Sequence, residues 1–187
     1  MIYAVIPTGN RPNEYKSVVD WCASKGITTV TIATSHEATG YATGIVVRDN
    51  TLNISRWWNL GIDIAYQAKA EHVFVLNDDI ALPDDWALRI VEALDAGYSG
   101  ASGERGTGHG LIQGYAFGLN GRQHIRADDK LVWWFGDDDI QKQCEQAGGF
   151  AIIPGMVVDN YYSNSSWVRF RQQIDMDRVY YTSKWGA

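Results

Sequence analysis

The feature that most constrains the fold is a short apolar segment that ends abruptly in acidic residues. Residues 73–76 read Val-Phe-Val-Leu, and Asn77, Asp78 and Asp79 follow directly. A continuous run of β-branched and aromatic residues predicts a strand that is buried on both faces, as in a parallel sheet. Open α/β sheets bind their ligands at the carboxyl ends of such strands. The sequence therefore predicts an α/β fold with its functional site at this turn.

The segments around this strand predict a single α/β domain with a mostly parallel central sheet flanked by helices. The order strand, helix, strand, strand at the start of the chain implies parallel strands joined by right-handed crossovers. No repeat, low-complexity linker or shift in composition divides the chain, so one domain spanning residues 1–187 is expected. Apolar runs predict strands at 2–6, 27–33, 45–47, 98–102, 115–119, 150–153 and 156–158, and periodicity predicts helices at 15–23 and 53–69, after Pro83, after Asp139 and, as a short one, in the tail.

Composition and charge narrow the class of protein. The chain is 45% hydrophobic and 20% charged, which is typical of a globular domain. Its net charge of −6 disfavours binding to duplex nucleic acid, which needs clustered Lys and Arg, but allows a nucleotide-sized ligand held through a metal. Cys22 and Cys144 have no metal-site spacing and fit a reducing compartment. Because no apolar run approaches the ~20 residues that cross a bilayer, we expect a cytoplasmic protein without membrane insertion.

A second acidic cluster resembles the first in its setting. Asp137, Asp138 and Asp139 follow the apolar residues 133–136, at the start of an expected helix. Clustered carboxylates repel one another unless a cation lies between them, and the hard cations Mg²⁺ and Mn²⁺ prefer oxygen ligands. Helix capping is the competing explanation, and it is preferred for Asp84 and Asp85. Two such clusters in one α/β domain favour a site for Mn²⁺ or Mg²⁺.

The order of these segments resembles the GT-A fold of nucleotide-sugar glycosyltransferases, especially the large inverting group that includes polysaccharide and rhamnosyl transferases. The resemblance covers nearly the whole chain. Residues 5–12, Val-Ile-Pro-Thr-Gly-Asn-Arg-Pro, are similar to the first-strand signature Val-Ile-Pro-Thr-x-Asn-Arg-Pro of that group. The other similar stretches are 53–65, the Asp-x-Asp-like stretch 75–84, the Phe-Gly-Glu-Asp-like turn 135–138, the late segment 157–159, and Lys184-Trp185-Gly186.

The resemblance implies roles for individual residues. It implies that Asp79 and Asp159 bind the metal ion and that Asp138, with Asp137 beside it in the same turn, is the catalytic base. For Arg11 and Arg56, an ordinary surface position is as good an explanation as pairing with phosphate oxygens. The donor contacts that the resemblance implies are Pro7, Thr8, Arg11, Ser35, Arg56, Asn77 and Asp78, the last as a ribose contact or a support for the metal ligand.

The sequence departs from the pattern of the group at several positions. The Asp that usually holds the nucleotide base after the second strand is replaced by the residues 34–37, Thr-Ser-His-Glu, so a UDP-sugar is only the default donor. Asn77 replaces the first acid of Asp-x-Asp, Asp159 replaces a usual His, and Asp137 replaces the usual Glu.

We therefore expect a metal-dependent, inverting glycosyltransferase that moves a sugar from a nucleotide-diphosphate sugar donor to a hydroxyl of a glycan, a lipid-linked sugar, a protein or a modified base. A nucleotidyltransferase is one alternative, although residues 8–11 are few for its glycine-rich phosphate loop. A degenerate nucleotide-sugar-binding module without turnover is the other. Residues 103–110, which include four glycines, are expected to form a mobile lid over the bound donor.

Overall fold

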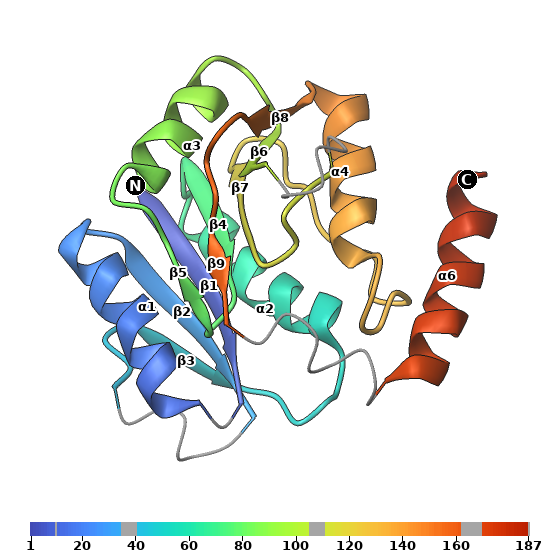
Figure 1. Cartoon of the computed structure of the whole chain (residues 1–187), viewed down its shortest axis with the longest axis horizontal. Helices are drawn as coiled ribbons and strands as arrows, with labels where there is room; N and C mark the ends of the chain where they lie inside the picture. Colours follow the sequence, from blue (N-terminus) through green and yellow to red (C-terminus); the bar gives the residue numbers. More distant parts are fainter. Residues whose placement is uncertain (10, 35–40, 105–110, 162–169, 187) are drawn as a thin grey trace.

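The computed structural model describes residues 1–9, 11–34, 41–104, 111–161 and 170–186. Its main sheet has seven strands in the order β3-β2-β1-β4-β7-β6-β8 (Figure 1). These strands are β1 (Ile2–Thr8), β2 (Thr28–Ala33), β3 (Ile45–Arg48), β4 (His72–Leu76), β6 (Gly100–Gly103), β7 (Ala116–Asn120) and β8 (Phe150–Ile153). A second sheet consists of β5 (Ile80–Ala81) and β9 (Asp159–Asn160).

The main sheet is mostly parallel, as predicted. Strands β1, β2, β3 and β4 run parallel to one another, and β6 runs parallel to β8. Strand β7 is antiparallel to both of its neighbours, β4 and β6. Its first residue, Ala116, is therefore paired with Leu76, the last residue of β4. The antiparallel strand thus brings the segment that precedes it to the carboxyl end of β4.

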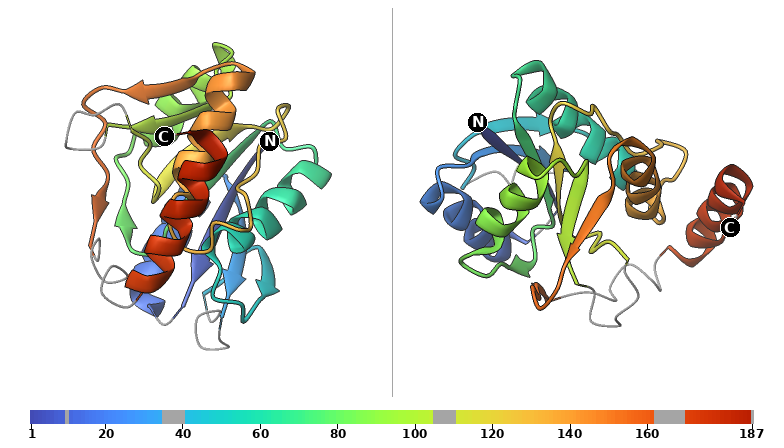
Figure 2. Two further views of the ribbon diagram at one scale, coloured as in Figure 1. Left: turned by 90° about the vertical axis from the view of Figure 1, so that its right-hand side faces the viewer. Right: turned by 90° about the horizontal axis from the view of Figure 1, so that it is seen from above.

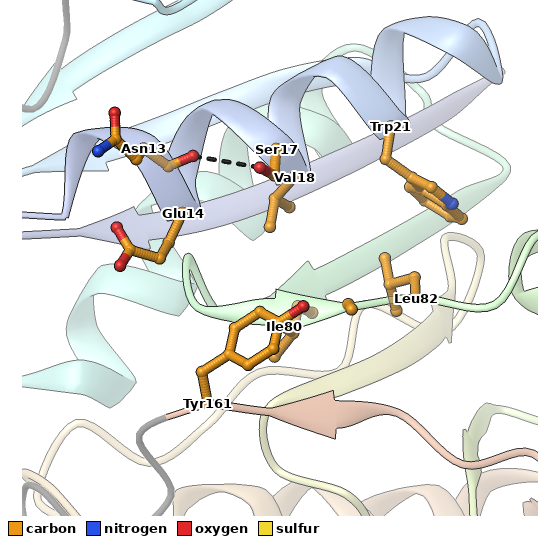
Figure 3. A pocket seen from close by; sticks show the side chains of 9 residues that line it. Asn13, Glu14, Ser17, Val18, Trp21, Ile80, Leu82 and Tyr161 are labelled. Atoms are coloured by element: carbon orange, nitrogen blue, oxygen red, sulfur yellow. Dashed lines mark hydrogen bonds between the residues drawn. The ribbon is translucent and has the colours of Figure 1, made fainter.

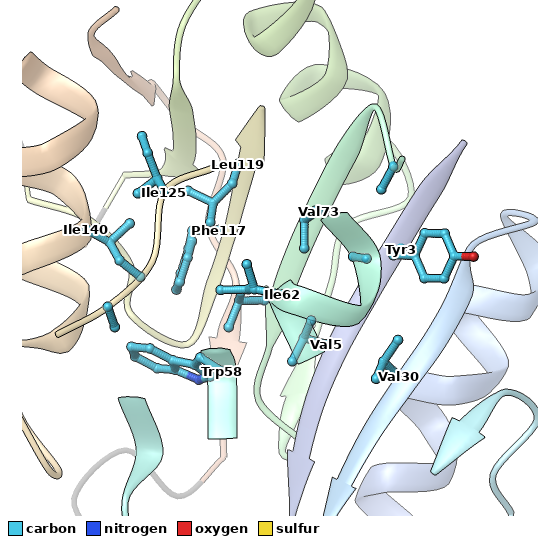
Figure 4. Packing of buried hydrophobic residues seen from close by; sticks show 14 of the residues in the cluster. Tyr3, Val5, Val30, Trp58, Ile62, Val73, Phe117, Leu119, Ile125 and Ile140 are labelled. Atoms are coloured by element: carbon cyan, nitrogen blue, oxygen red, sulfur yellow. The ribbon is translucent and has the colours of Figure 1, made fainter. Parts of the chain in front are cut away.

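Helices cover both faces of the sheet. The helices are α1 (Pro12–Ser24), α2 (Ile54–Gln67), α3 (Trp86–Asp95), α4 (Gly136–Ala147) and α6 (Arg171–Trp185). Val73 and Val75 of β4 belong to the core cluster formed with α2 and α4 (Figure 4), whereas Phe74 and Leu76 belong to the cluster formed with α1 and α3. The apolar run is therefore buried on both faces, which confirms its prediction as a central strand.

Glycine allows α2 to approach the sheet closely. A Cβ atom on Gly61 would lie 2.3 Å from Cγ1 of Val5 in β1. Since Val5 is fully buried and β-branched, its side chain has little freedom to move away. The N-terminus of α2 lies beside the first turn of α4, where a Cβ atom on Gly136 would lie 2.4 Å from Oγ of Ser55.

Two local predictions were wrong. Residues 156–158 form no strand; Met156 and Val158 are buried in the cluster with α1 and α3, and this alternating burial, without a hydrogen-bond ladder, imitates a strand pattern. The nearby strand β9 begins at Asp159. The expected cap of α3 is also missing, because Asp85 occupies the N-cap position without a side-chain hydrogen bond to the helix.

The C-terminal segment forms a longer helix than expected. Helix α6 has 15 residues and lies alongside α4 at one side of the molecule (Figure 2). Among the described residues, no helix is both long enough and apolar enough to cross a membrane.

Candidate active site

The end of β1 fixes Asp78 at the carboxyl edge of the sheet. Because β1 and β4 are parallel neighbours, both strands end at this edge. Oγ1 of Thr8 donates a hydrogen bond to Oδ2 of Asp78 at 2.8 Å, and the N–H of Gly9 donates to the same oxygen at 3.4 Å. Nη1 of Arg11 lies 3.5 Å from Oδ1 of Asp78. The predicted residues Thr8, Arg11 and Asp78 therefore form one cluster.

Asp79 completes this cluster and has one unpartnered oxygen. Nη1 of Arg11 forms an ion pair with Oδ2 of Asp79 as well, so one guanidinium group faces two carboxylates that are only 7% (Asp78) and 3% (Asp79) exposed. Oδ1 of Asp79 is buried and has no hydrogen-bond partner among the described residues. A buried, unpaired oxygen is costly to the folded state, which makes this atom a natural acceptor for a cation or a ligand donor group.

Burial raises the pKa values of both carboxyl groups of the cluster. Burial raises the pKa of Asp78; Thr8 and Arg11 oppose this effect, while the charge of Asp79 adds to it. Burial likewise raises the pKa of Asp79, and Arg11 opposes it. Both groups keep a raised pKa despite Arg11, so a further cation would stabilise their ionised forms.

The charge balance of the cluster leads to a prediction for Arg11. We expect Arg11→Met to lower the free energy of unfolding by about 1–3 kcal/mol near neutral pH, because two buried carboxylates then lose their counter-charge. Their pKa values, already raised, would rise further, so lowering the pH protonates them and removes the penalty. The destabilisation should therefore shrink as the pH falls through these raised pKa values.

Chemical denaturation of Arg11→Met at neutral and acidic pH measures this effect. Lys25→Met is the matched control, because Lys25 pairs with Asp84, whose side chain is 99% exposed. A deficit in Arg11→Met that stays constant with pH would contradict the charge-balance explanation.

The small sheet carries Asp159 toward the acidic turn. Asp159 is paired with Ala81 and Asn160 with Ile80, and the N–H of Tyr161 donates to the carbonyl oxygen of Asp79 at 3.0 Å. Asp159 is exposed and lies two positions along this ladder from Asp79. Among the described residues, no group of three or more His, Cys, Asp or Glu side chains is arranged to hold a metal ion.

A pocket adjoins the acidic turn on the side of α1. It has a volume of about 360 Å³ and lies between α1 and the small sheet, with Glu14, Trp21, Leu82 and Tyr161 in its lining (Figure 3). Ile80, the residue directly after Asp79, also lines this pocket, so the pocket and the acidic turn are neighbours.

The second acidic cluster lies in the first turn of α4 and approaches the first cluster through the segment before β7. A Cβ atom on Gly114 would lie 2.0 Å from Oδ2 of Asp137, so the carboxylate of Asp137 lies directly against this glycine. The carbonyl of the next residue, Tyr115, accepts a hydrogen bond of 2.8 Å from the N–H of Asn77. Both clusters therefore flank residues 114 and 115.

The three acidic residues of this cluster have different environments. Asp138 is half-buried and lies near Tyr181 of α6; burial raises the pKa of Tyr181 to about 12, and the charge of Asp138 is the next contribution. Asp139 is fully buried, and its Oδ1 accepts hydrogen bonds from Nζ of Lys184 at 2.6 Å and Nε1 of Trp185 at 2.9 Å. Lys184 and Trp185 of α6 thus bind the acidic cluster in the first turn of α4.

The remaining predicted contacts lie in other positions. Pro7 is buried in β1, where it is paired with Ile32 of β2. Nε of Arg56 lies 3.0 Å from Oδ2 of Asp49, so a contact with phosphate requires this ion pair to open. Burial tends to raise the pKa of Asp49, but hydrogen bonds, including that from Arg56, outweigh burial and lower it.

Ser35, predicted to contact the nucleotide, lies outside the described residues, as do residues 105–110 of the predicted lid.

Several residues that shape the site were not found from the sequence. Asp177 of α6 is 1% exposed and accepts hydrogen bonds from the N–H groups of Trp133 and Trp134. On α2, Ser55 and Asn59 bind the backbone carbonyls of residues 131 and 127. Ser55 and Asn59 are four residues apart on a helix that packs against the core, and in the sequence this spacing is only a weak signal that both side chains are buried. No comparable signal marks Asp177.

Comparison with known proteins identifies the fold but no close relative. No family model matches the sequence, and no curated protein matches it. Solved structures that match include S. aureus TarS 1–349, with a TM-score of 0.62 and 10% identity over 94% of this chain and 64% of the TarS chain. A putative nucleotide-diphospho-sugar transferase from Desulfovibrio desulfuricans G20 matches with a TM-score of 0.57 and 13% identity over 96% of this chain and 97% of the other.

A putative glucose-1-phosphate thymidylyltransferase from Bacillus anthracis matches with a TM-score of 0.57 and 11% identity over 95% of this chain and 96% of the other. The second and third of these structures bear the names of two kinds of transferase, and at these identities the likeness concerns the fold. The chain therefore has the GT-A-like fold of nucleotide-sugar transferases, which glycosyltransferases and nucleotidyltransferases share.

Proposed function

We propose that the protein is a metal-dependent, inverting glycosyltransferase that moves a sugar from a nucleoside-diphosphate sugar, by default a UDP-sugar, to an acceptor hydroxyl. The observation that carries this proposal is the turn at the carboxyl end of β4. There two buried carboxylates share the charge of Arg11, and Oδ1 of Asp79 has no partner among the described residues. Such a turn suits a divalent cation and the diphosphate that accompanies it.

The residues present fit Mn²⁺ or Mg²⁺. Asp79 offers a buried, unpaired oxygen, and Asp159 offers an exposed carboxylate on the neighbouring strand. Two carboxylates are sufficient, because Mg²⁺ is commonly held by one or two carboxylates together with substrate phosphates. A bound ion would neutralise the charge that develops on the leaving diphosphate.

The donor would lie along the edge formed by β1 and β4. Asp78 is fixed by Thr8 and Gly9, so its carboxylate has a defined orientation for a ribose hydroxyl or for support of Arg11. Arg11 brings positive charge to the same edge and suits phosphate oxygens. Asn77 and Pro7 belong to the same edge. The backbone N–H of Asn77 bonds to the carbonyl of Tyr115, and Pro7 is paired with Ile32 of β2.

We assign the role of general base to Asp138. In the transfer step the acceptor oxygen attacks the anomeric carbon while the bond from that carbon to the diphosphate oxygen breaks. The proton of the acceptor hydroxyl passes to the carboxylate of Asp138. Its position in the first turn of α4 favours the ionised form that accepts this proton. Direct attack opposite the leaving group inverts the anomeric configuration.

A nucleotidyltransferase is the second candidate, and the likeness to the thymidylyltransferase favours it. Enzymes of that class usually place a glycine-rich phosphate loop after the first strand. Here β1 ends at Thr8 and α1 begins at Pro12, so residues 9–11 alone connect them. This short connection favours the glycosyltransferase.

A thermal-shift screen separates the candidates. The protein is heated with a panel of nucleotide sugars and nucleoside triphosphates, each with and without Mn²⁺, because ligands that bind the native state raise its melting temperature. We expect a rise that requires both a nucleoside-diphosphate sugar and Mn²⁺. A rise with nucleoside triphosphates alone would favour the nucleotidyltransferase, and no rise with any nucleotide would contradict both enzymes.

A further inference from the structure

Polar contacts join helix α6 to the two ends of the turn that carries the candidate base. Of the residues of α6, all of which the structure describes, Ile174 and Asp177 are the buried ones. The helix therefore contributes little apolar surface to the core. Its polar side chains instead bind the segment 132–139, on both sides of the turn at 135–138.

The first point of contact is Asp177. Its Oδ2 accepts hydrogen bonds from the backbone N–H groups of Trp133 at 2.8 Å and Trp134 at 2.9 Å, and its Oδ1 accepts one from the N–H of Val132 at 3.2 Å. Nε2 of Gln173 donates to Oδ1 at 2.7 Å. Hydrogen bonds to an ionised carboxylate are stronger than neutral ones. The backbone immediately before the turn is thus fixed from α6.

The second point of contact is Asp139. In addition to Lys184 and Trp185, it accepts hydrogen bonds from the N–H of Asp128 at 3.1 Å and from Nε2 of Gln143 at 2.8 Å. Lys184 also lies 3.0 Å from Oδ2 of Asp128. Burial alone would lower the pKa of Lys184, but Asp139 and Asp128 outweigh this effect and raise it, so its amine stays charged. The backbone immediately after the turn is fixed as well.

The turn between these points is strained. Phe135 has a φ of +64°, in the left-handed region that residues with a side chain rarely adopt. Its ring stacks on Tyr181 of α6 at 5.2 Å between centroids. A conformation of this kind persists only where the surrounding structure enforces it, and it is frequent at functional sites. Here α6 provides contacts before, at and after the strained residue.

We propose that α6 is a positioning element of the active site, in which Asp177 and Lys184 are positioning residues that hold the turn 135–138 in the geometry required for proton transfer. The catalytic part of this inference rests on the proposed function, whereas the ordering of the turn by α6 does not. A displacement of a catalytic group by about 1 Å can cost on the order of 10² in rate.

Four variants test the inference. Lys184→Met removes the charge that binds Asp139, and Lys184→Arg retains it. Asp177→Asn keeps the size of the side chain but removes the charge that attracts three N–H groups. Arg178→Met is the matched control on the same helix, because Arg178 pairs with the exposed Asp175 of α6, at 3.3 Å. Should Lys184→Met fail to fold, Trp185→Phe removes one hydrogen bond to Asp139 and keeps an aromatic ring at this position.

Hydrogen exchange measured by mass spectrometry tests the ordering of the turn without any ligand. We expect faster exchange in peptides that cover residues 130–140 in Asp177→Asn and Lys184→Met, with parental exchange in Arg178→Met and Lys184→Arg. Peptides from β1 and α1 should exchange as in the parent protein. Parental exchange of residues 130–140 in both Asp177→Asn and Lys184→Met would overturn the inference, whatever the activity of the protein.

Kinetics test whether α6 affects catalysis. The assay measures the release of UDP from UDP-glucose, UDP-galactose and UDP-N-acetylglucosamine in the presence of Mn²⁺. We expect kcat to fall about tenfold or more in Lys184→Met with an unchanged KM for the donor, and to recover in Lys184→Arg. An unchanged kcat, or an equal loss in Arg178→Met, would overturn the positioning role. If the parent protein releases no UDP, the proposed function has failed, and hydrogen exchange alone decides whether α6 orders the turn.

Discussion

Asp138→Asn is expected to reduce sugar transfer by about 10²–10⁴-fold while donor binding stays at the parental level. This range is the usual loss on removing a positioned general base. Asparagine keeps the size of the side chain and much of its hydrogen bonding, but it cannot accept the proton of the acceptor hydroxyl. Donor binding should survive because the proposed metal and donor contacts lie at the ends of β1 and β4 rather than on α4. Initial rates of donor turnover and donor affinity, measured on the same preparation, provide the test.

Asp137→Asn is the necessary control for this prediction. The carboxylate of Asp137 lies against Gly114, next to the segment that binds Asn77, whereas Asp138 lies nearer to Tyr181. Both residues stand in the first turn of α4, and both are half-buried. We expect a much smaller loss for Asp137→Asn. The reverse order of effects would move the role of the base to Asp137, and full activity in both variants would contradict the mechanism.

Asp79→Ala is expected to abolish Mn²⁺-dependent nucleotide binding without destabilising the protein. The substitution removes the proposed metal ligand, but it also removes a buried carboxylate whose pKa is raised mainly by burial. Arg11 then faces Asp78 alone, which is a balanced pair. The free energy of unfolding should therefore stay the same or rise, as is common where a site is built at the expense of stability. Calorimetric titration with Mn²⁺ and UDP, together with chemical denaturation, measures both effects.

Asp84→Ala is the control for Asp79→Ala, because Asp84 belongs to the same stretch of sequence and its side chain is 99% exposed. It should retain Mn²⁺-dependent binding. Parental Mn²⁺-dependent affinity in Asp79→Ala would remove Asp79 from the metal site. A large loss of stability in the same variant would instead show that Asp79 serves the fold.

Local patterns in the sequence were sufficient to predict the first half of the fold. The run 73–76 contains no polar residue, and burial on both faces of a parallel sheet requires this pattern. The helices α1 and α2 have apolar residues at helical spacing, and both were predicted to within a few residues. The acidic turn was found because an apolar strand and a cluster of carboxylates meet within a few positions of the sequence.

The remaining features depend on contacts between distant residues. Nothing local distinguishes the antiparallel strand β7 from a parallel one, because direction follows from its pairing with β4 and β6. Residues 156–158 alternate in burial like a strand but lack a partner strand among the described residues. Asp139 was grouped with Asp137 and Asp138 because the sequence shows three equal carboxylates. Its structural role becomes visible only through Lys184 and Trp185, which lie far along the chain.

The measurement that tests the central claim most directly is product analysis after incubation with UDP-sugars, with Mn²⁺ or with EDTA. The proposed function predicts that UDP is released, that EDTA stops its release, and that the transferred or freed sugar has the inverted anomeric configuration. Release of UDP that does not require a metal ion would contradict the proposed site at Asp79. Formation of pyrophosphate from a nucleoside triphosphate and a sugar 1-phosphate, with no release of UDP from any UDP-sugar, would contradict the claim that the protein is a glycosyltransferase.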